Sequence, residues 1–302
     1  MSETDDHLWL ESGRGLAPER NWSFTTDAPL TSLTLARESG EVIAADESGG
    51  VYLFDRLGQV VALTRGLHVL QDLAWSDDGR RGAAVIGDST LCVLGRHLKP
   101  EWTQEFSQQI AAIDIAPFGN HVAVCLANGE NRVIDMEQKT VGRFETIRPL
   151  GFLKFVPNHA SMIGAADYGL LCRYRLNGQA EWSENLWSNV GDISLSGDGR
   201  AIYLASFSYG IQRFDGEGEN RGAYIVEGSP GHVATTWAPK RMAVSTVERQ
   251  LYWMDADGEL LWATAAPDEL VRLRCDALGK GLVCGFRSGR IVHLVWGLPE
   301  RD

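Results

Sequence analysis

The segments EWTQEFSQQIAAIDI (residues 101–115) and EWSENLWSNVGDISL (residues 181–195) carry the pattern that decides the fold. Each contains a tryptophan eleven residues before an apolar residue, and the same spacing occurs twice more in the chain. The four pairs are Trp22 and Leu33, Trp102 and Ile113, Trp182 and Ile193, and Trp262 and Leu273. Tryptophans at constant 80-residue intervals indicate a chain built from copies of one supersecondary unit.

The period of the repeat is half of the tryptophan spacing. The apolar residue recurs once in each copy, at Leu33, Leu73, Ile113, Leu153, Ile193, Thr235 and Leu273. The steps between these positions are 40, 40, 40, 40, 42 and 38 residues. Seven copies of this length account for nearly the whole chain.

Each copy contains four short extended segments separated by turns. In the fifth copy these segments are residues 190–195, 201–205, 211–215 and 223–226, with Gly- and Asp-rich turns at 197–199 and 216–218. Alternating apolar residues between such turns predict four antiparallel strands, here named a, b, c and d. A unit of this size cannot bury both of its faces alone, so the copies are expected to pack radially as an all-β, seven-bladed β-propeller.

The seventh copy lacks a fourth strand, because only residues 270–275, 282–286 and 291–295 precede the end of the chain. The segment 21–25 occupies the phase of strand d, so the N-terminus is expected to complete blade seven and close the ring. Residues 20–302 are predicted to be one propeller, with blade seven made of about 270–296 plus 20–27. Residues 1–19 are expected to be a partly disordered extension, in which His7–Leu10 pack on the ring and the acidic Met1–Asp6 are disordered.

Two motifs resemble known propeller families. Strand c ends in an aromatic-Asp pattern that resembles WD40 repeats, at Tyr52–Asp55, Arg132–Asp135, Gln212–Asp215 and Tyr252–Asp255. The Gly-His pair of WD40 blades does not recur in register. Asp255–Trp262 looks like the Asp-x-x-Gly-x-x-x-Trp docking motif of quinoprotein-like propellers, and Asn177–Trp182 is a partial copy. The resemblance covers about 280 residues and implies architecture rather than activity.

Charge and composition exclude several classes of function. The chain has 28 Lys and Arg against 40 Asp and Glu, a net charge of -12, which repels phosphate backbones and disfavours nucleic acid as a partner. The sequence opens without a secretion signal and contains no run of the roughly 18 apolar residues that span a bilayer, so a cytoplasmic protein that does not insert in membranes is expected. Five scattered cysteines are expected to be buried free thiols.

A search for catalytic chemistry gives negative results. The seven histidines form no His-x-His or His-x-x-x-His pair, and the cysteines form no Cys-x-x-Cys, so no local metal site is encoded. No nucleophile elbow or phosphate-binding glycine loop is present. We therefore expect no catalytic residues, metal or cofactor, and a protein that is not an enzyme and is monomeric by itself.

Two sets of residues are candidates for function. Charged residues lie in strand a, which lines the central channel, at Asp72, Asp114, Lys154, Asp192, Arg272 and Arg274. They predict either a polar ligand site on the axis or ion pairs between blades around a wet channel. The a-b and c-d turns form one rim of the ring, here the turn rim. The b-c and d-a loops form the other, the loop rim, whose large side chains include Tyr168, Trp187, Phe207, Tyr209, Arg249 and Arg287.

Aromatic and arginine side chains are enriched in interface hot spots, whereas a turn rarely needs them for folding. The loop rim is therefore the predicted binding surface of a non-catalytic interaction platform for a protein or peptide, as the WD40 resemblance implies. The alternative role for these rim side chains is to cap the hydrophobic ends of adjacent blades. The alternative function, implied by the quinoprotein resemblance, is a small ligand or a reaction at the central channel. The strand d tryptophans are expected to be structural and to pack between blades.

Overall fold

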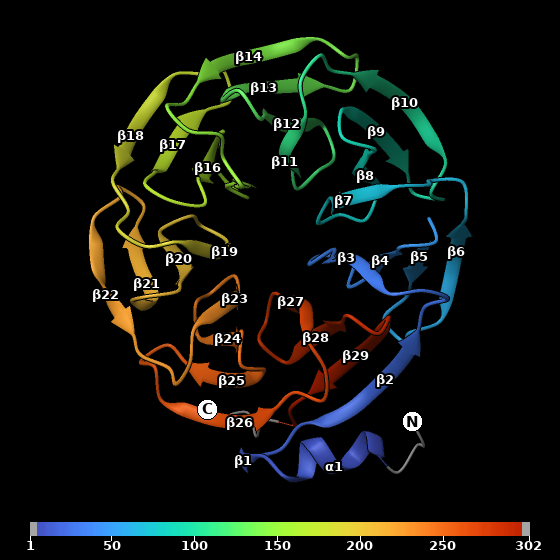
Figure 1. Cartoon of the computed structure of the whole chain (residues 1–302), viewed down its shortest axis with the longest axis vertical. Coiled ribbons are helices and arrows are strands. Elements are labelled where there is room, and N and C mark those ends of the chain that lie inside the picture. Colours follow the sequence, from blue (N-terminus) through green and yellow to red (C-terminus); the bar gives the residue numbers. More distant parts are fainter. Residues whose placement is uncertain (1–4, 298–302) are drawn as a thin grey trace.

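The computed structural model describes residues 5–297, and over this range the chain forms a closed ring of seven antiparallel sheets (Figure 1). Each sheet is one blade. Its first strand lies at the centre of the ring and its last strand lies at the perimeter. The seven-bladed β-propeller predicted from the repeat is confirmed.

The strands of blades one to three follow the chain from centre to perimeter. Blade one contains β3 (Leu30–Leu35), β4 (Val42–Asp46), β5 (Val51–Phe54) and β6 (Val60–Thr64). Blade two contains β7 (Leu70–Trp75), β8 (Arg81–Ile86), β9 (Thr90–Gly95) and β10 (Pro100–Glu105). Blade three contains β11 (Ile110–Ile115), β12 (His121–Leu126), β13 (Glu130–Asp135) and β14 (Thr140–Glu145).

Blades four and five repeat this order. Blade four contains β15 (Phe152–Phe155), β16 (Ser161–Ala165), β17 (Leu171–Arg175) and β18 (Ala180–Glu184). Blade five contains β19 (Val190–Leu195), β20 (Ala201–Ser206), β21 (Gly210–Asp215) and β22 (Asn220–Tyr224).

Blades six and seven involve both ends of the chain. Blade six contains β23 (Pro230–Thr235), β24 (Arg241–Thr246), β25 (Gln250–Asp255), β26 (Leu260–Ala265) and a fifth strand, β1 (Arg14–Gly15). Blade seven contains β27 (Leu270–Cys275), β28 (Gly281–Phe286), β29 (Arg290–Val295) and β2 (Glu19–Thr25). Helix α1 (Asp5–Glu11) precedes β1.

The repeat is more regular than the sequence pattern indicates. In blade six, Val233 pairs with Val244 in the register that joins Ile193 to Leu204 in blade five. The prediction of Thr235 as the sixth anchor is therefore wrong, and with Val233 every step is 40 residues. Residues two apart point to the same face of a strand, so alternation alone did not distinguish Val233 from Thr235.

The N-terminal strand closes the ring as predicted. Strand β2 pairs with β29 in antiparallel register, with Trp22 opposite His293. Ahead of this closure, Trp9 and Leu10 of α1 are buried against blades six and seven. Disorder was expected for Met1–Asp6. Residues 1–4 of this segment lie outside the described residues, whereas Asp5 and Asp6 begin helix α1.

Strand d tryptophans pack against the neighbouring blade. Trp22 lies against the c-d turn of blade one at Gly58, and Trp182 lies against the c-d turn of blade five, where its Nε1 donates to the Gly216 carbonyl at 2.9 Å. Blade seven has no c-d turn, because its fourth strand comes from the N-terminus. Trp262, in strand d of blade six, therefore has no c-d turn to pack against, and Trp9 and Trp296 pack against it instead.

The aspartate that ends strand c has a local structural role. Asp55 Oδ1 accepts hydrogen bonds from the backbone N–H groups of Leu57 and Gln59, both at 2.9 Å. Asp135, Asp215 and Asp255 make the same pair of bonds in their own blades. The aromatic-Asp pattern therefore encodes a cap for the c-d turn, which is how Asp favours turns in general.

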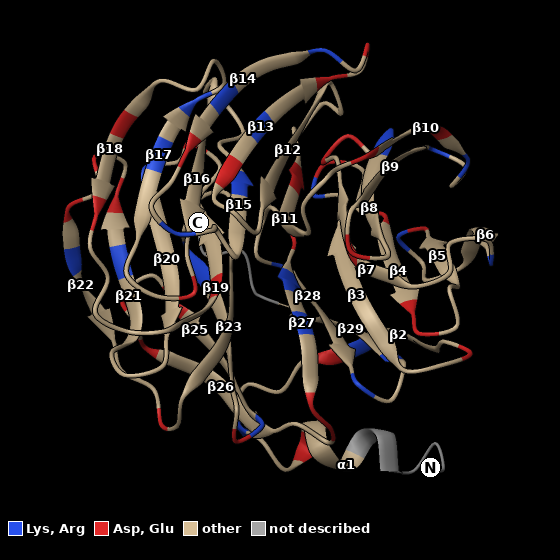
Figure 2. Cartoon of the chain, turned by 45° about the horizontal axis from the view of Figure 1, so that its top comes forward, with Lys and Arg blue, Asp and Glu red and all other residues tan. Residues whose placement is uncertain are grey.

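The expectation of buried free thiols is confirmed for all five cysteines. No helix of the described chain is long and apolar enough to cross a membrane. Basic and acidic residues are interspersed around the ring, so the net negative charge is not gathered on one side of the view in Figure 2.

Candidate partner-binding surface and central channel

Four aromatic side chains stand exposed on the loop rim of blades four and five. Tyr168 lies in the b-c loop of blade four, Trp187 in the loop that joins the two blades, and Phe207 and Tyr209 in the b-c loop of blade five. Their exposed fractions are 42%, 75%, 41% and 48%. These four residues are called the aromatic platform below.

Hydrogen bonds tie the three loops of the platform together. Tyr168 forms an isolated antiparallel bridge with Asn189. The carbonyl of Asn189 accepts a bond from Phe207 N at 3.1 Å, and Ser188 Oγ accepts one from Ser208 N at 3.1 Å. The platform is thus built on backbone that is already ordered.

The platform also touches the wall of the central channel. A Cβ added at Gly191 in β19 would lie 2.9 Å from Phe207 Cε1 and 2.5 Å from the Gly231 carbonyl. Glycine therefore allows the phenyl ring and the strand of blade six to approach β19 closely. Phe207 of the platform therefore packs directly against β19, the channel strand of blade five.

Aliphatic residues extend the platform in both directions along the rim. Ile147 precedes blade four, whereas Ile225 and Val247 belong to the loops around blade six, and all three are more than half exposed. On the Ile147 side, the Arg148 guanidinium carbon lies 5.7 Å from the centre of the Tyr168 ring. The sequence search weighed aromatic and arginine residues and missed these aliphatic ones, although an apolar residue at a loop tip was the available signal.

The two predicted rim arginines lie in the loops of blades six and seven, outside the three platform loops. Arg249 is exposed in the b-c loop of blade six, with a left-handed φ of 63°. Arg287 belongs to blade seven and pairs with Glu269, Nη2 to Oε1, at 2.9 Å. The structure therefore brings together the four predicted aromatic residues but does not place Arg287 with them.

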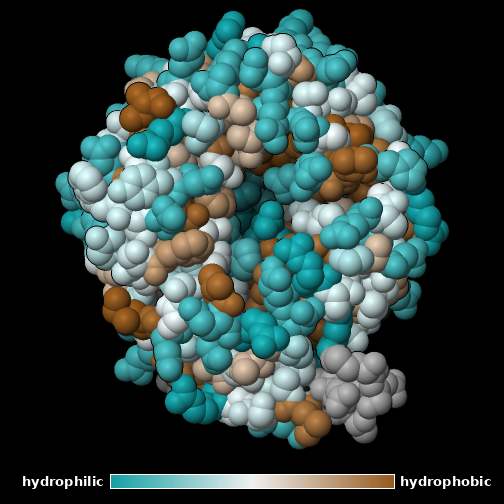
Figure 3. Space-filling model, in the orientation of Figure 1, coloured by the Kyte–Doolittle hydropathy of each residue, from teal (hydrophilic) through white to brown (hydrophobic). Residues whose placement is uncertain are grey.

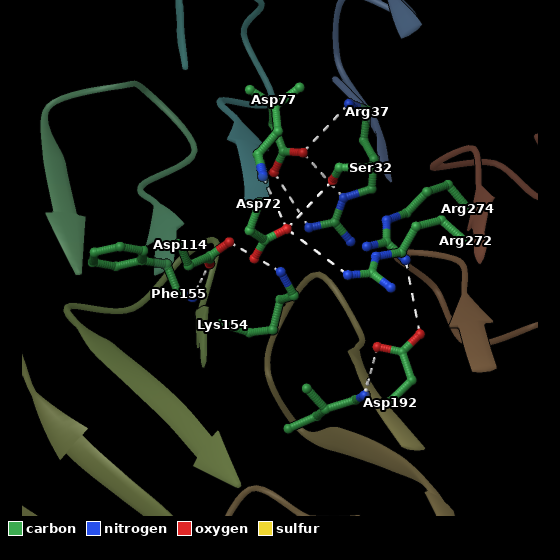
Figure 4. A network of polar contacts seen from close by, with 12 residues as sticks. Ser32, Arg37, Asp72, Asp77, Asp114, Lys154, Phe155, Asp192, Arg272 and Arg274 are labelled. Atoms are coloured by element: carbon green, nitrogen blue, oxygen red, sulfur yellow. Dashed lines mark hydrogen bonds and ion pairs between the residues drawn. The ribbon is translucent and has the colours of Figure 1, made fainter. Parts of the chain in front are cut away.

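All six predicted channel residues line a cavity of about 170 Å³ at the centre of the ring (Figure 4). They occupy two layers, because positions 32 and 34 of blade one and their equivalents at 40-residue steps point inward. Asp72, Asp192 and Arg272 belong to the first layer, and Asp114, Lys154 and Arg274 to the second. Figure 3 shows the ring hollowed at its centre, with hydrophilic surface at the opening.

One channel ion pair is tight and joins neighbouring blades. Lys154 Nζ lies 3.0 Å from Asp114 Oδ1, and Asp114 Oδ2 accepts the Phe155 backbone N–H at 2.7 Å. Burial raises the pKa of the Asp114 carboxyl, and the Lys154 ammonium opposes this shift. This pair links blades three and four, as expected of ion pairs around a wet channel.

Two further pairs are looser and cross the channel. Arg272 Nη2 lies 3.8 Å from Asp72 Oδ1, and Arg274 Nη1 lies 3.8 Å from Asp192 Oδ2. Burial acts to raise the pKa of Asp192, but His232 and Arg274 outweigh it and hold this pKa below its usual value. Both separations exceed hydrogen-bond distance, so each pair leaves polar groups facing the cavity.

The turn-rim end of the cavity holds residues that sequence reasoning missed. Arg37 Nε lies 3.1 Å from Asp77 Oδ1, and the Arg37 guanidinium carbon lies 5.6 Å from the centre of the Trp237 ring. These contacts join blades one, two and six across the axis. Arg37 and Asp77 follow strand a rather than lying in it, so the alternation of that strand did not reveal them.

No protein-family model matches the chain, and no curated protein does. Among solved structures, the chain is similar to the β-propeller domain of Cps50 (Swd1) from Myceliophteria thermophila, with 16% identity and a TM-score of 0.77. The match covers 93% of this chain and 100% of that domain. The comparison therefore agrees with the β-propeller fold, and at this identity the likeness shows the fold alone.

Proposed function

We propose that the protein is a non-catalytic interaction platform that binds a protein or peptide at the aromatic platform of the loop rim. The observation that carries the proposal is the exposure of Tyr168, Trp187, Phe207 and Tyr209 on loops already tied by backbone hydrogen bonds. Clusters of large exposed aromatic side chains mark binding surfaces.

The order of the loops favours tight association. Binding costs free energy when side chains and loops must be immobilised, at about 0.5–1.5 kcal/mol for each flexible side chain. Tyrosine and tryptophan have only two side-chain torsions, and the Asn189 bonds already fix the backbone beneath them. A partner therefore gains apolar contact area without first ordering this surface.

The chemistry of the platform indicates the kind of segment it binds. Around the aromatic rings the loops expose the uncharged polar residues Asn185, Asn189 and Ser208, together with the carboxylate of Asp167. Ile147 and Ile225 continue the apolar surface at its two ends. A segment with apolar or aromatic side chains and accessible backbone polar groups would match both features.

The test is capture of partners from the protein's own cells by a variant with Tyr168, Phe207 and Tyr209 all changed to Ala. We expect an intact ring by circular dichroism and the loss of at least one specifically captured partner. Phe118→Ala is the matched control, because Phe118 is 60% exposed on the opposite, turn rim. Equal recovery of every partner by the wild type and the triple variant would refute this surface.

A second candidate function is the binding of a small polar ligand in the channel. Asp192 Oδ2 is buried without a hydrogen-bond partner. Arg272 and Arg274 donate side-chain hydrogen bonds to the carbonyls of Val271 and Leu273, in their own strand. Native mass spectrometry of the purified protein tests this proposal. A bound small molecule lost in Asp192→Asn supports it, and an empty spectrum from protein purified without dialysis counts against it.

A further inference from the structure

The outer strand of blade one differs from the other outer strands of the ring. Five of the seven outer strands, β2, β10, β14, β18 and β22, contain at least one charged residue. The two without any charge are β6, with the sequence VVALT, and β26, with the sequence LLWATA. Charged residues on an edge strand prevent it from pairing with another strand.

The uncharged strand β26 is covered by the chain itself. Strand β1 pairs with it, placing Gly15 opposite Trp262 and Arg14 opposite Ala263. Leu16 N donates to the Leu261 carbonyl at 3.0 Å. One of the two uncharged outer strands is therefore occupied by a further strand.

Strand β6 has no such cover within the described chain. It pairs with β5 on one side and forms the perimeter of the ring on the other (Figure 1). Val60, Val61 and Leu63 are 40%, 53% and 41% exposed, and Leu57 in the preceding turn is exposed as well. The edge thus presents unpaired backbone groups beside a patch of apolar side chains.

We propose that β6 pairs with β6 of a second copy of this chain, so that two rings meet edge to edge as a twofold dimer. A second copy carries the same uncharged edge with exposed Val60, Val61 and Leu63, so two β6 strands meet without like-charge repulsion and bury apolar side chains on both sides. The positions that β1 uses on β26 correspond to Ala62 and Leu63 in β6. Antiparallel pairing of Ala62 with Ala62 of the other copy satisfies the twofold symmetry, because a twofold axis normal to the sheet places the central residue opposite its own copy.

The surroundings of β6 are compatible with this arrangement. In β6, Val61 is the bulged residue, because the register passes from Phe54 opposite Val60 to Leu53 opposite Ala62. Strand β26 has the same bulge at Leu261 and still accepts β1. The neighbouring Arg65 is paired with Asp27 of its own chain, so it brings no unpaired charge to the edge.

The pairing of two blade edges is a small interface, so we expect a reversible dimer with micromolar affinity. This dimer differs from the monomer that the repeat sequence predicts. It lies at the perimeter and leaves the aromatic platform on the loop rim free. It therefore stands independently of the proposed function.

The test is the molar mass of the full chain by sedimentation velocity between about 1 and 100 μM, a range that spans weak pairing. We expect the wild type to shift from monomer towards dimer as concentration rises, and Val61→Lys to remain monomeric at every concentration. The bulge position of other blades holds Glu101, Glu181 or Arg221, so a charge there is compatible with folding.

Val141→Lys is the matched control. Val141 is the bulged, exposed residue of β14, a strand that already contains Arg143 and Glu145. We expect this variant to dimerise like the wild type. A wild type that stays monomeric at the highest concentration overturns the proposal, as does equal loss of the dimer in Val61→Lys and Val141→Lys.

Discussion

The closure of the ring and the aromatic platform contain the same kinds of side chain in opposite environments. At the closure, Trp9, Trp22, Trp262 and Trp296 are buried, and Trp262 is fully excluded from solvent. On the platform, Trp187 is 75% exposed, and Tyr168, Phe207 and Tyr209 are exposed on the loops joined to its own. The closure uses its aromatic rings to join the two ends of the chain, whereas the platform leaves its rings partly exposed on the loop rim.

The position of an aromatic side chain in the fold, rather than its residue type, therefore decides whether it contributes to stability or is available for binding. The closure has to join segments more than 200 residues apart, and large buried rings supply apolar area there at a small cost in side-chain entropy. The platform loops are held by backbone hydrogen bonds, so their side chains are not needed for that purpose. Substitutions in the two regions should therefore change different measurements.

The largest effect is expected from Trp262→Ala at the closure. Removal of a fully buried tryptophan leaves a cavity between α1, blade six and Trp296, and should lower the free energy of unfolding by about 3–5 kcal/mol. Urea denaturation measures this change. Trp187→Ala is the control, with an expected change below about 0.5 kcal/mol. Similar losses in both variants would show that the platform is structural.

A slightly smaller loss is expected from Trp9→Ala in the N-terminal helix. The Trp9 ring centre lies 6.2 Å from Trp262 and 6.0 Å from Phe286, so its removal exposes one side of the closure. We expect about 2–4 kcal/mol of destabilisation in urea. Leu8→Ala in the same helix is exposed and should change stability little. If Trp9→Ala is as stable as Leu8→Ala, the helix is not part of the closure.

The third prediction concerns binding by the platform. Trp187→Ala should weaken the affinity for a partner captured by the wild type about tenfold or more, as expected when a hot-spot aromatic is truncated. Isothermal titration calorimetry with that partner measures the change. Leu278→Ala, an exposed apolar residue in the a-b turn of blade seven, should leave the affinity unaltered. An effect of Leu278→Ala and none of Trp187→Ala would move the binding surface to the turn rim.

The smallest effect is a pH dependence of the closure. Burial holds the pKa of His293 below its ordinary value of 6.5, and Asn21 Nδ2 lies 3.0 Å from His293 Nδ1, where a neutral ring can accept a hydrogen bond. Because the pKa is lower in the folded state, the contribution of His293 to stability is complete above pH 6.5. It is lost as the pH falls through the lower folded value.

Thermal denaturation of the wild type and His293→Gln between pH 7.5 and 5 tests this dependence. The wild type should lose more of its midpoint temperature on acidification than His293→Gln does. Substitution of the platform aromatic residues should leave the pH profile unchanged, because none of them touches the closure. If the thermal midpoints of the wild type and His293→Gln change equally with pH, His293 does not cause the pH dependence of stability.

The sequence predicted the parts of the molecule that follow from the repeat. The phase of Trp22 predicted the closing strand, and the inward positions of strand a predicted the channel charges. It did not predict β1, because a two-residue strand carries no periodic pattern. The Arg37 and Asp77 contact and the aliphatic ends of the platform were also missed, since their neighbours are set by packing between blades rather than by local spacing.

The 40-residue period and the phase of Trp22 determined the number of blades, the order of the strands and the closure of the ring, because they fix how much chain each blade receives and which segment completes the last blade. The tertiary structure alone decided how α1 and Trp296 join the closure, which loops are tied together and which charges pair across the channel. Those outcomes depend on residues from different blades, such as Trp9 with Trp262 or Arg274 with Asp192. Their separations are set only when the ring closes.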